Sequence, residues 1–206
     1  MTNTHSNPNI AVILGTTRPT RWGHKPAEWI KDKIIADGRM TADILDLADF
    51  DLPMFDEMAS NKWMPSKDPK AVKWQETLAQ YDGYVFVTAE YNHSISGALK
   101  NALDQAFNEW ARKPAAVVGY GGVGAARAVE HLRAIAVELR MVNVASAVHI
   151  GGGELMKVHP MGGNADASIA EIDAVLAPSA AAMLDELYWW ADLLKGARAA
   201  EERKAA

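Results

Sequence analysis

The sequence of 206 residues contains no cysteine. This absence excludes disulfide bonds, thiolate metal sites, cysteine nucleophiles and the attachment of a flavin to a cysteine side chain. Any redox chemistry must therefore come from a bound cofactor.

Excess positive charge and long apolar runs are also missing. The formal net charge is -5 at pH 7, and no basic run is interleaved with aromatic residues, so nucleic acid is not an expected partner. No stretch approaches the ~20 apolar residues of a membrane span, and residues 1–9 lack the apolar core of a signal peptide. We expect a cytoplasmic protein that does not bind a membrane.

The composition is typical of a globular domain, with 49% hydrophobic and 23% charged residues. Single cores are common at this chain length. We therefore expect one domain over residues 1–206, with flexible ends at 1–9 and 197–206.

Short apolar runs alternate with segments of helical periodicity along the whole chain. The runs predict strands over 10–14, 44–47, 84–88, 115–120 and 142–150. The periodic segments predict helices over 22–36, 71–81, 97–110, 121–139 and 166–194, with Pro178 as a candidate break in the last one. Residues 49–69 and 151–165 predict loops. This alternation is typical of an α/β doubly wound parallel sheet of five strands with helices on both faces, whose ligands bind at the carboxyl ends of the strands.

The loop after the first predicted strand combines hydroxyls, guanidinium groups and free backbone amides at the start of a helix. It reads Gly-Thr-Thr-Arg-Pro-Thr-Arg-Trp-Gly over residues 15–23. Walker and GxGxxG motifs are missing from it, which disfavours nucleoside triphosphates and classical dinucleotide binding. These groups predict a phosphate site, and the alternative is an ordinary turn with solvated arginines.

A second loop carries the most specific motif. Residues 90–94 read Glu-Tyr-Asn-His-Ser, and residues 97–104 read Gly-Ala-Leu-Lys-Asn-Ala-Leu-Asp. This pattern resembles the signature of the NADPH-dependent FMN reductase family, as do the first loop and the run Val-Gly-Tyr-Gly-Gly-Val-Gly at 118–124. The likeness covers residues 10–150. It implies a flavodoxin-like sheet of strand order 2-1-3-4-5 that holds FMN without a covalent bond.

The resemblance also implies which residues bind the flavin. The phosphate is expected at the first loop, and the ring between the second loop and a glycine-containing third loop whose bare amides can approach it. The predicted FMN-binding residues are Thr16, Arg18, Arg21, Trp22, Gly23, Ala89, Glu90, Tyr91, Asn92, His93, Ser94, Tyr120, Gly121 and Gly122.

Three residues depart from the family pattern. Thr16 replaces a serine and keeps its hydroxyl, whereas Ala89 and Ser96 replace prolines and make the second loop less rigid. Glu90 is interpreted as an anchor of that loop, with a general base as the alternative. His93 and His131 have no second ligand at metal-binding spacing, so no metal site is predicted.

The resemblance implies an enzyme in which NADPH or NADH reduces FMN, after which a small electron acceptor takes the place of the oxidised nucleotide in a ping-pong cycle. No obligatory catalytic side chain is expected, because the cofactor performs the difficult step. The alternatives are a flavodoxin-type electron carrier and a flavin-dependent regulatory protein without nicotinamide turnover. The sequence does not distinguish a quinone, an azo compound, a flavin or a metal ion as the acceptor, or NADH from NADPH.

The family likeness further implies a homodimer or homotetramer. Trp63 and its neighbouring methionines, in the predicted loop 49–69, are candidates for a subunit contact or for a cover over the acceptor pocket. The run Tyr-Trp-Trp at 188–190 is expected to pack against the core or against a partner subunit.

Overall fold

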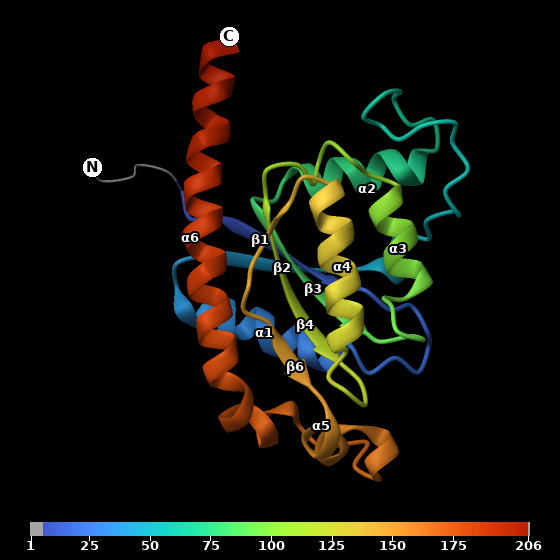
Figure 1. Cartoon of the computed structure of the whole chain (residues 1–206), viewed down its shortest axis with the longest axis vertical. Coiled ribbons are helices and arrows are strands. Elements are labelled where there is room, and N and C mark those ends of the chain that lie inside the picture. The colour runs from blue at the N-terminus through green and yellow to red at the C-terminus, as the bar shows by residue number, and fades with distance from the viewer. Residues whose placement is uncertain (1–5, 206) are drawn as a thin grey trace.

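Within residues 6–205, the part that the computed structural model describes, six strands form one parallel sheet (Figure 1). The strand order is β2-β1-β3-β4-β5, and β6 also pairs with β4. This arrangement confirms the predicted flavodoxin-like fold. The strands are β1 (Asn9–Leu14), β2 (Thr41–Asp46), β3 (Gly83–Ala89), β4 (Pro114–Tyr120), β5 (Val142–Asn143) and β6 (Val148–Ile150).

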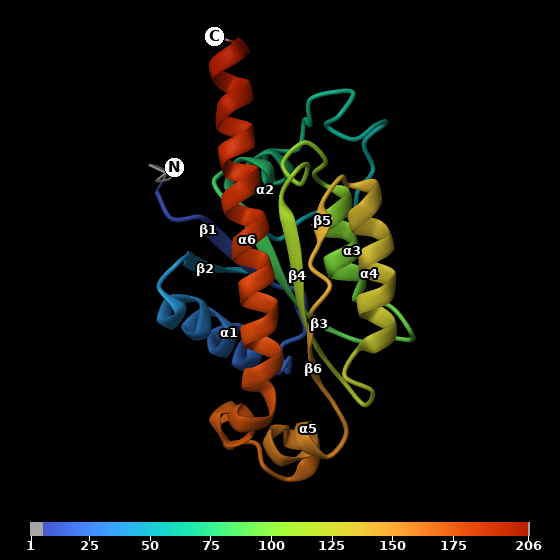
Figure 2. The same cartoon turned by 60° about the vertical axis from the view of Figure 1, so that its left-hand side comes forward.

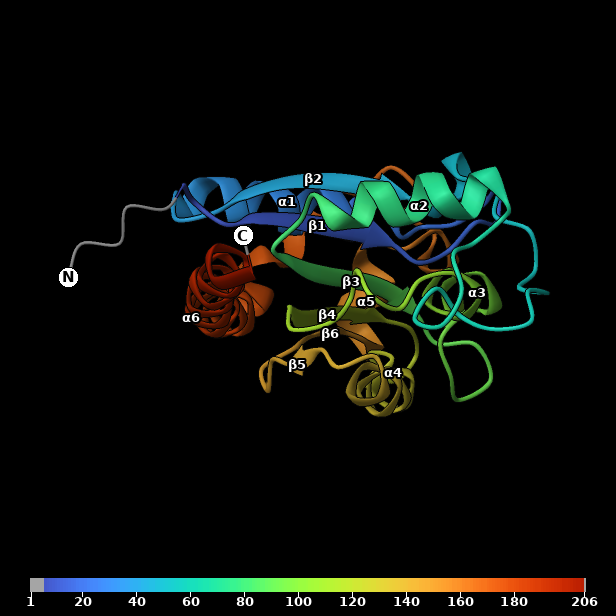
Figure 3. The ribbon, with the colours of Figure 1, turned by 90° about the horizontal axis from the view of Figure 1, so that it is seen from above.

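Two layers of helices cover the sheet. The helices α1 and α6 lie on one face, and α2, α3 and α4 lie on the other (Figures 2 and 3). Their apolar side chains form two separate cores with the two faces of the sheet. Every residue of β3 and β4 is buried, as expected for central strands covered on both sides. The helices are α1 (His24–Asp37), α2 (Pro69–Ala79), α3 (Gly97–Asp104), α4 (Ala126–Glu138), α5 (Gly152–Val158) and α6 (Asp173–Ala205).

Side-chain caps define where two of these helices begin. The Asp68 carboxylate accepts from the first amides of α2, which also has a proline in its first turn. The Ser96 hydroxyl accepts from the Leu99 amide at the start of α3 and donates to the Gly15 carbonyl. Ser96 therefore links the start of α3 to the loop after β1.

The prediction of one strand over residues 142–150 is wrong, because β5 and β6 are separate strands on the same neighbour. The Ala145 and Ser146 amides donate to the Glu186 carboxylate of α6 at 2.9 and 3.1 Å instead of to β4. A side chain 40 residues away thus interrupts the strand.

The third helix is shorter than predicted, since it ends at Asp104 rather than at residue 110. Beyond that point side chains take up the backbone carbonyls. The Trp110 indole donates to the Leu103 and Ala106 carbonyls, and the Gln75 amide donates to the Gln105 carbonyl. The chain can therefore turn away without leaving these carbonyls unpaired.

The region after residue 150 also differs from the prediction. Residues 151–165 contain α5 and a short 3-10 turn, and the last helix begins at Asp173 rather than at 166. Pro178 lies inside α6 without ending it, and the helix continues to Ala205, past the sheet (Figure 1). Residues 1–5 and 206 of the predicted flexible ends lie outside the described residues, and the flexibility of the remainder stays a prediction.

No helix in residues 6–205 combines the length and the apolar character that crossing a bilayer requires.

Candidate functional site

Three loops follow the neighbouring strands β1, β3 and β4 at the carboxyl edge of the sheet. They are residues 15–23, 90–96 and 121–125, and we call them the first, second and third loops. Because β3 pairs with both β1 and β4 in parallel, the three loops leave the sheet side by side. This is the edge at which doubly wound sheets bind ligands.

Buried hydroxyls connect the first and third loops. Thr16 is fully buried, and its Oγ1 lies 3.2 Å from the Tyr120 hydroxyl at the end of β4. Burial raises the pKa of Tyr120, while its hydrogen bond to Thr16 lowers it. The phenol therefore stays neutral near pH 7 and can donate or accept one hydrogen bond.

Close packing requires Gly23 where the first loop enters α1. A Cβ at this position would lie 2.7 Å from Leu14 Cδ1 and 2.7 Å from the Tyr120 hydroxyl. Gly23 caps α1 with no side-chain hydrogen bond. The Lys25 amide donates to the Trp22 carbonyl and Pro26 has no N–H, so the His24 amide is the one in this first turn that is left open to an anion among the described residues.

The two arginines of the first loop have different surroundings. The exposed Arg18 places its guanidinium 4.9 Å from the centre of the Tyr91 ring. Arg21 forms an ion pair with Asp46 at the end of β2, and its Nε is buried without a partner. Arg18 is therefore the more available of the two for an incoming anion.

The second loop contains a tight turn next to that ring. The Tyr91 and Ser94 backbones exchange hydrogen bonds of 2.8 and 3.1 Å. Between them Asn92 and His93 both have positive φ, at 50° and 69°, as a type I′ turn requires. Backbone strain of this kind at non-glycine residues is concentrated at functional sites.

Glu90 anchors this turn to the start of α4. Its carboxylate accepts from Arg127 Nε at 2.6 Å and from the Arg127 backbone amide at 3.2 Å. The hydrogen bond from the Arg127 guanidinium is the main cause that lowers the pKa of Glu90, against a smaller effect of burial. The anchor interpretation matches these contacts, because a carboxylate held ionised by a guanidinium is a weak base.

The two histidines beside this loop also contact protein groups. His93 Nε2 lies 2.7 Å from Arg127 Nη1, and the Ser94 hydroxyl lies 2.6 Å from His131 Nδ1. Arg127 and His131 stand four residues apart, on one side of α4. Together these contacts hold the second loop against α4.

The third loop leaves open space above the sheet. Gly121 has φ +152°, which favours glycine, and its amide donates to the Ile150 carbonyl at 3.1 Å. A Cβ on the exposed Gly122 would have no heavy atom within 4 Å. A flat ligand can approach the backbone at this point.

The structure brings the predicted residues together at one edge, but sequence reasoning missed several of their partners. The missed partners are Asp46 of β2, which pairs with Arg21, Arg127 of α4, which pairs with Glu90, and Val158 of α5, whose carbonyl accepts from Trp22. The motifs gave no signal for them, because each lies 25 or more residues from the group that it binds. The position of Asp46 at the carboxyl end of the second strand was the one feature of the sequence that indicated a contact with this edge of the sheet.

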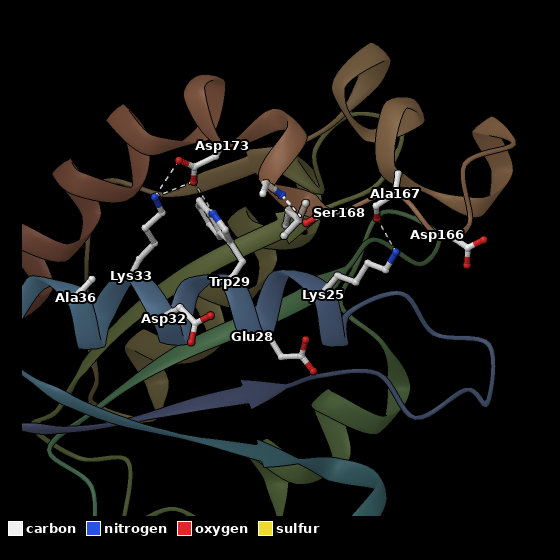
Figure 4. Close-up of a pocket in the computed structure, with 12 residues that line it drawn as sticks. Lys25, Glu28, Trp29, Asp32, Lys33, Ala36, Asp166, Ala167, Ser168 and Asp173 are labelled. Atoms are coloured by element: carbon white, nitrogen blue, oxygen red, sulfur yellow. Dashed lines mark hydrogen bonds and ion pairs between the residues drawn. The ribbon is translucent and has the colours of Figure 1, made fainter.

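A cavity of about 700 Å³ lies apart from these loops, between α1 and residues 166–173 (Figure 4). Trp29 and Lys33 both point across it to Asp173, while Glu28 and Asp32 point away. None of the predicted site residues lines this cavity. It separates α1 from the segment that precedes α6.

A family model described as NADPH-dependent FMN reductase matches residues 8–154. The chain belongs to this family. The match includes all three loops and ends before α6, so the last helix lies outside it.

Individual relatives agree with this assignment. An NAD(P)H-dependent FMN reductase from a Nectria species is 38% identical over 127 residues, which are 58% of this chain and 62% of that protein. The matched region thus spans less than two thirds of that relative. A 2-hydroxy-1,4-benzoquinone reductase from a Burkholderia species is 30% identical over 141 residues, which are 65% of this chain and 72% of that protein.

A solved structure extends the likeness over most of the fold. It is FerB, a flavoenzyme NAD(P)H:(acceptor) oxidoreductase from Paracoccus denitrificans, with a TM-score of 0.63 and 25% sequence identity. The similarity covers 87% of this chain and 97% of FerB.

The residues at the carboxyl edge fit the cofactor in this family's name. Buried polar groups normally have hydrogen-bond partners, yet Arg21 Nε and the Tyr91 hydroxyl have none among the described residues. Both belong to the site and can serve a polar ligand. The Arg18 guanidinium and the open His24 amide at the start of α1 add donors suited to a phosphate.

Replacing Glu90 with glutamine is expected to weaken FMN and riboflavin binding equally, by about 3- to 10-fold, because the second loop loses a charged anchor rather than a phosphate contact. Flavin fluorescence quenching measures both affinities. Because the pKa of Glu90 is lowered, its ionised carboxylate stabilises the second loop fully at pH values above the ordinary glutamate pKa. This stabilisation is lost as the pH falls through the lowered pKa. The difference in flavin affinity between the wild type and the Glu90 variant should therefore be present at pH 7 and become smaller only below about pH 4.

Glu130→Gln is the matched control. Glu130 lies on the exposed side of α4, the helix that carries Arg127, and forms an ion pair with Arg133. This variant should bind both flavins like the wild type. Equal affinities for the Glu90 variant and the wild type at pH 7 would refute the anchor.

Proposed function

We propose that this chain is an NAD(P)H-dependent FMN oxidoreductase that reduces small quinone-like acceptors. The observation that carries the proposal is the convergence of the three loops, with the family's signature residues, at one edge of the sheet. The quinone class is supported by the name of the Burkholderia relative.

The side chains of this site bind and orient the cofactor. When bound, FMN accepts a hydride from the nicotinamide nucleotide and passes two electrons to the acceptor. Thr16, Arg18 and Arg21, with the backbone amide of His24 at the start of α1, would hold the phosphate. The turn at 91–94 lines the ring, and the space at Gly122 leaves room above the third loop.

The backbone amides of Asn92, His93 and Gly122, which have no acceptor among the described residues, would be available to a ring that becomes negatively charged on reduction. Fixed dipoles of this kind stabilise developing charge without reorganising during the reaction. The protein needs no proton-transferring side chain in this proposal, which agrees with the structural engagement of Glu90 and His93 by Arg127.

The test is steady-state oxidation of NADPH and of NADH by the FMN-loaded protein with 1,4-benzoquinone. We expect a yellow protein whose double-reciprocal plots are parallel lines, as in a ping-pong mechanism. Rates with azo, flavin and ferric acceptors would then show which class of acceptor is reduced fastest. A protein that stays colourless and shows no binding when titrated with FMN overturns the proposal. FMN binding without nicotinamide oxidation favours an electron carrier or a regulatory protein instead.

We further propose that the protein forms a homodimer or homotetramer in the cytoplasm, where NAD(P)H is supplied. Exposed apolar side chains between residues 54 and 64 support self-association, since Met58 is 91% and Trp63 73% exposed. Light scattering after size-exclusion chromatography measures the mass, and a monomer at micromolar concentration contradicts this part of the proposal.

A further inference from the structure

Residues 151–172 pass over the outer side of the first loop, and we call them the crossing segment. The Trp22 indole donates to the Val158 carbonyl at 3.0 Å. Lys25 Nζ, in the first turn of α1, donates to the Ala165 carbonyl at 2.9 Å and to the Ala167 carbonyl at 2.7 Å. Figure 4 shows Lys25 reaching Ala167. The crossing segment is therefore hydrogen-bonded to the chain both before and after Gly23, where the first loop ends and α1 begins.

These fastenings place His159 beside the first loop. Its half-buried ring lies 5.5 Å from the Trp22 ring, centre to centre. The other neighbour of Trp22 is Tyr120, at 5.3 Å, whose hydroxyl contacts Thr16. One chain of ring contacts thus joins His159 to the buried hydroxyls of the site.

The hydrogen bonding of His159 leaves one donor available. Its Nδ1 accepts from the Met161 backbone amide at 3.2 Å, so the neutral ring carries its proton on Nε2. Among residues 6–205 this Nε2 has no hydrogen-bond partner. A half-buried N–H without a partner is suited to an acceptor supplied by a ligand.

The charge around His159 indicates the sign of that ligand. Burial and, after it, the positive charges of Arg18 and Lys25 lower the pKa of His159. Within the described part of the chain, no carboxylate offsets them. The positive charges of Arg18 and Lys25, together with the imidazole donor, favour an anion with several acceptor oxygens.

We propose that His159 is a further ligand of the FMN phosphate, and that the crossing segment forms an outer wall of the phosphate site. The inference rests on the proposed function, since it assumes that the first loop holds a phosphate monoester. It assigns a binding role to a residue outside the family match, which ends at 154.

The experiment compares FMN with riboflavin, which has the same ring and no phosphate. His159→Phe keeps an aromatic ring against Trp22 and removes the donor, whereas His159→Gln restores an N–H donor. We expect the phenylalanine variant to bind FMN about 10-fold more weakly with unchanged riboflavin affinity. The glutamine variant should recover most of the loss, and Met161→Ala, at an 80% exposed neighbour, should match the wild type.

Each outcome has one meaning. Unchanged riboflavin affinity of the phenylalanine variant shows that the ring site is still folded, so the FMN affinity can be interpreted. An unchanged ratio of FMN to riboflavin affinity overturns the role of His159 while the proposed function stands. A wild-type protein that fails to bind FMN overturns the proposed function itself.

Discussion

Replacing Arg18 with alanine is expected to weaken FMN binding by about 10- to 100-fold while riboflavin affinity stays within about 2-fold. A hydrogen bond to a charged group contributes about 1.5–3 kcal/mol, and a guanidinium binds phosphate oxygens in pairs. Arg18 has no carboxylate partner among the described residues, and its guanidinium lies over the ring of Tyr91 in the second loop. Its charge is thus available where the phosphate is expected.

The control is Arg203→Ala, which removes the same side chain from the exposed end of α6. This variant should bind both flavins like the wild type, which excludes a general effect of net charge. Isothermal titration of the apoprotein with each flavin gives the affinities. A fall in riboflavin affinity as large as the fall in FMN affinity would place Arg18 at the ring rather than at the phosphate.

Arg21 shows how far the sequence could predict this site. Hydroxyls and arginines after a buried strand are a local pattern, so the first loop could be assigned without coordinates. This pattern predicts the same phosphate-binding role for Arg18 and Arg21. Only the fold reveals that Asp46, at the end of the neighbouring strand, pairs with Arg21 and leaves Arg18 as the freer cation.

The fold was predictable for a similar reason. The strands β3 and β4 are continuous apolar runs because both of their faces are covered, and this leaves a clear mark in the sequence. The break between β5 and β6 leaves no such mark, since it depends on Glu186 of α6 reaching two backbone amides.

The helix α5 and the crossing segment also escaped prediction for a physical reason. Glycines at 151–153 favour a loop by their conformational freedom, and tertiary contacts override this preference. Leu155 and Val158 are buried, and the Val158 carbonyl accepts from Trp22, 136 residues earlier in the chain. Local sequence patterns carry no information about a contact of this range.

Replacing Trp110 with alanine is expected to lower the free energy of unfolding by about 3–5 kcal/mol, as for other large buried aromatic side chains. The Trp110 ring is fully buried and packs edge-on against the Tyr84 ring, with centres 4.7 Å apart, and against Trp74 at 6.0 Å. Its indole N–H also pairs two carbonyls at the end of α3, which the truncation would leave without this donor.

Val137→Ala is the control, because it truncates an apolar side chain that is 67% exposed on α4. Its effect should stay within about 0.5 kcal/mol, and urea unfolding followed by circular dichroism measures both variants. Because domains of this kind are stable by only about 5–15 kcal/mol, the Trp110 variant should unfold at a much lower urea concentration. Trp110 lies beyond the C-terminal end of α3, whereas Ser96 and its contact with the first loop lie at the start of this helix, so the folded fraction should still bind FMN with wild-type affinity. Equal stability of the two variants would show that the core around Trp110 is loosely packed.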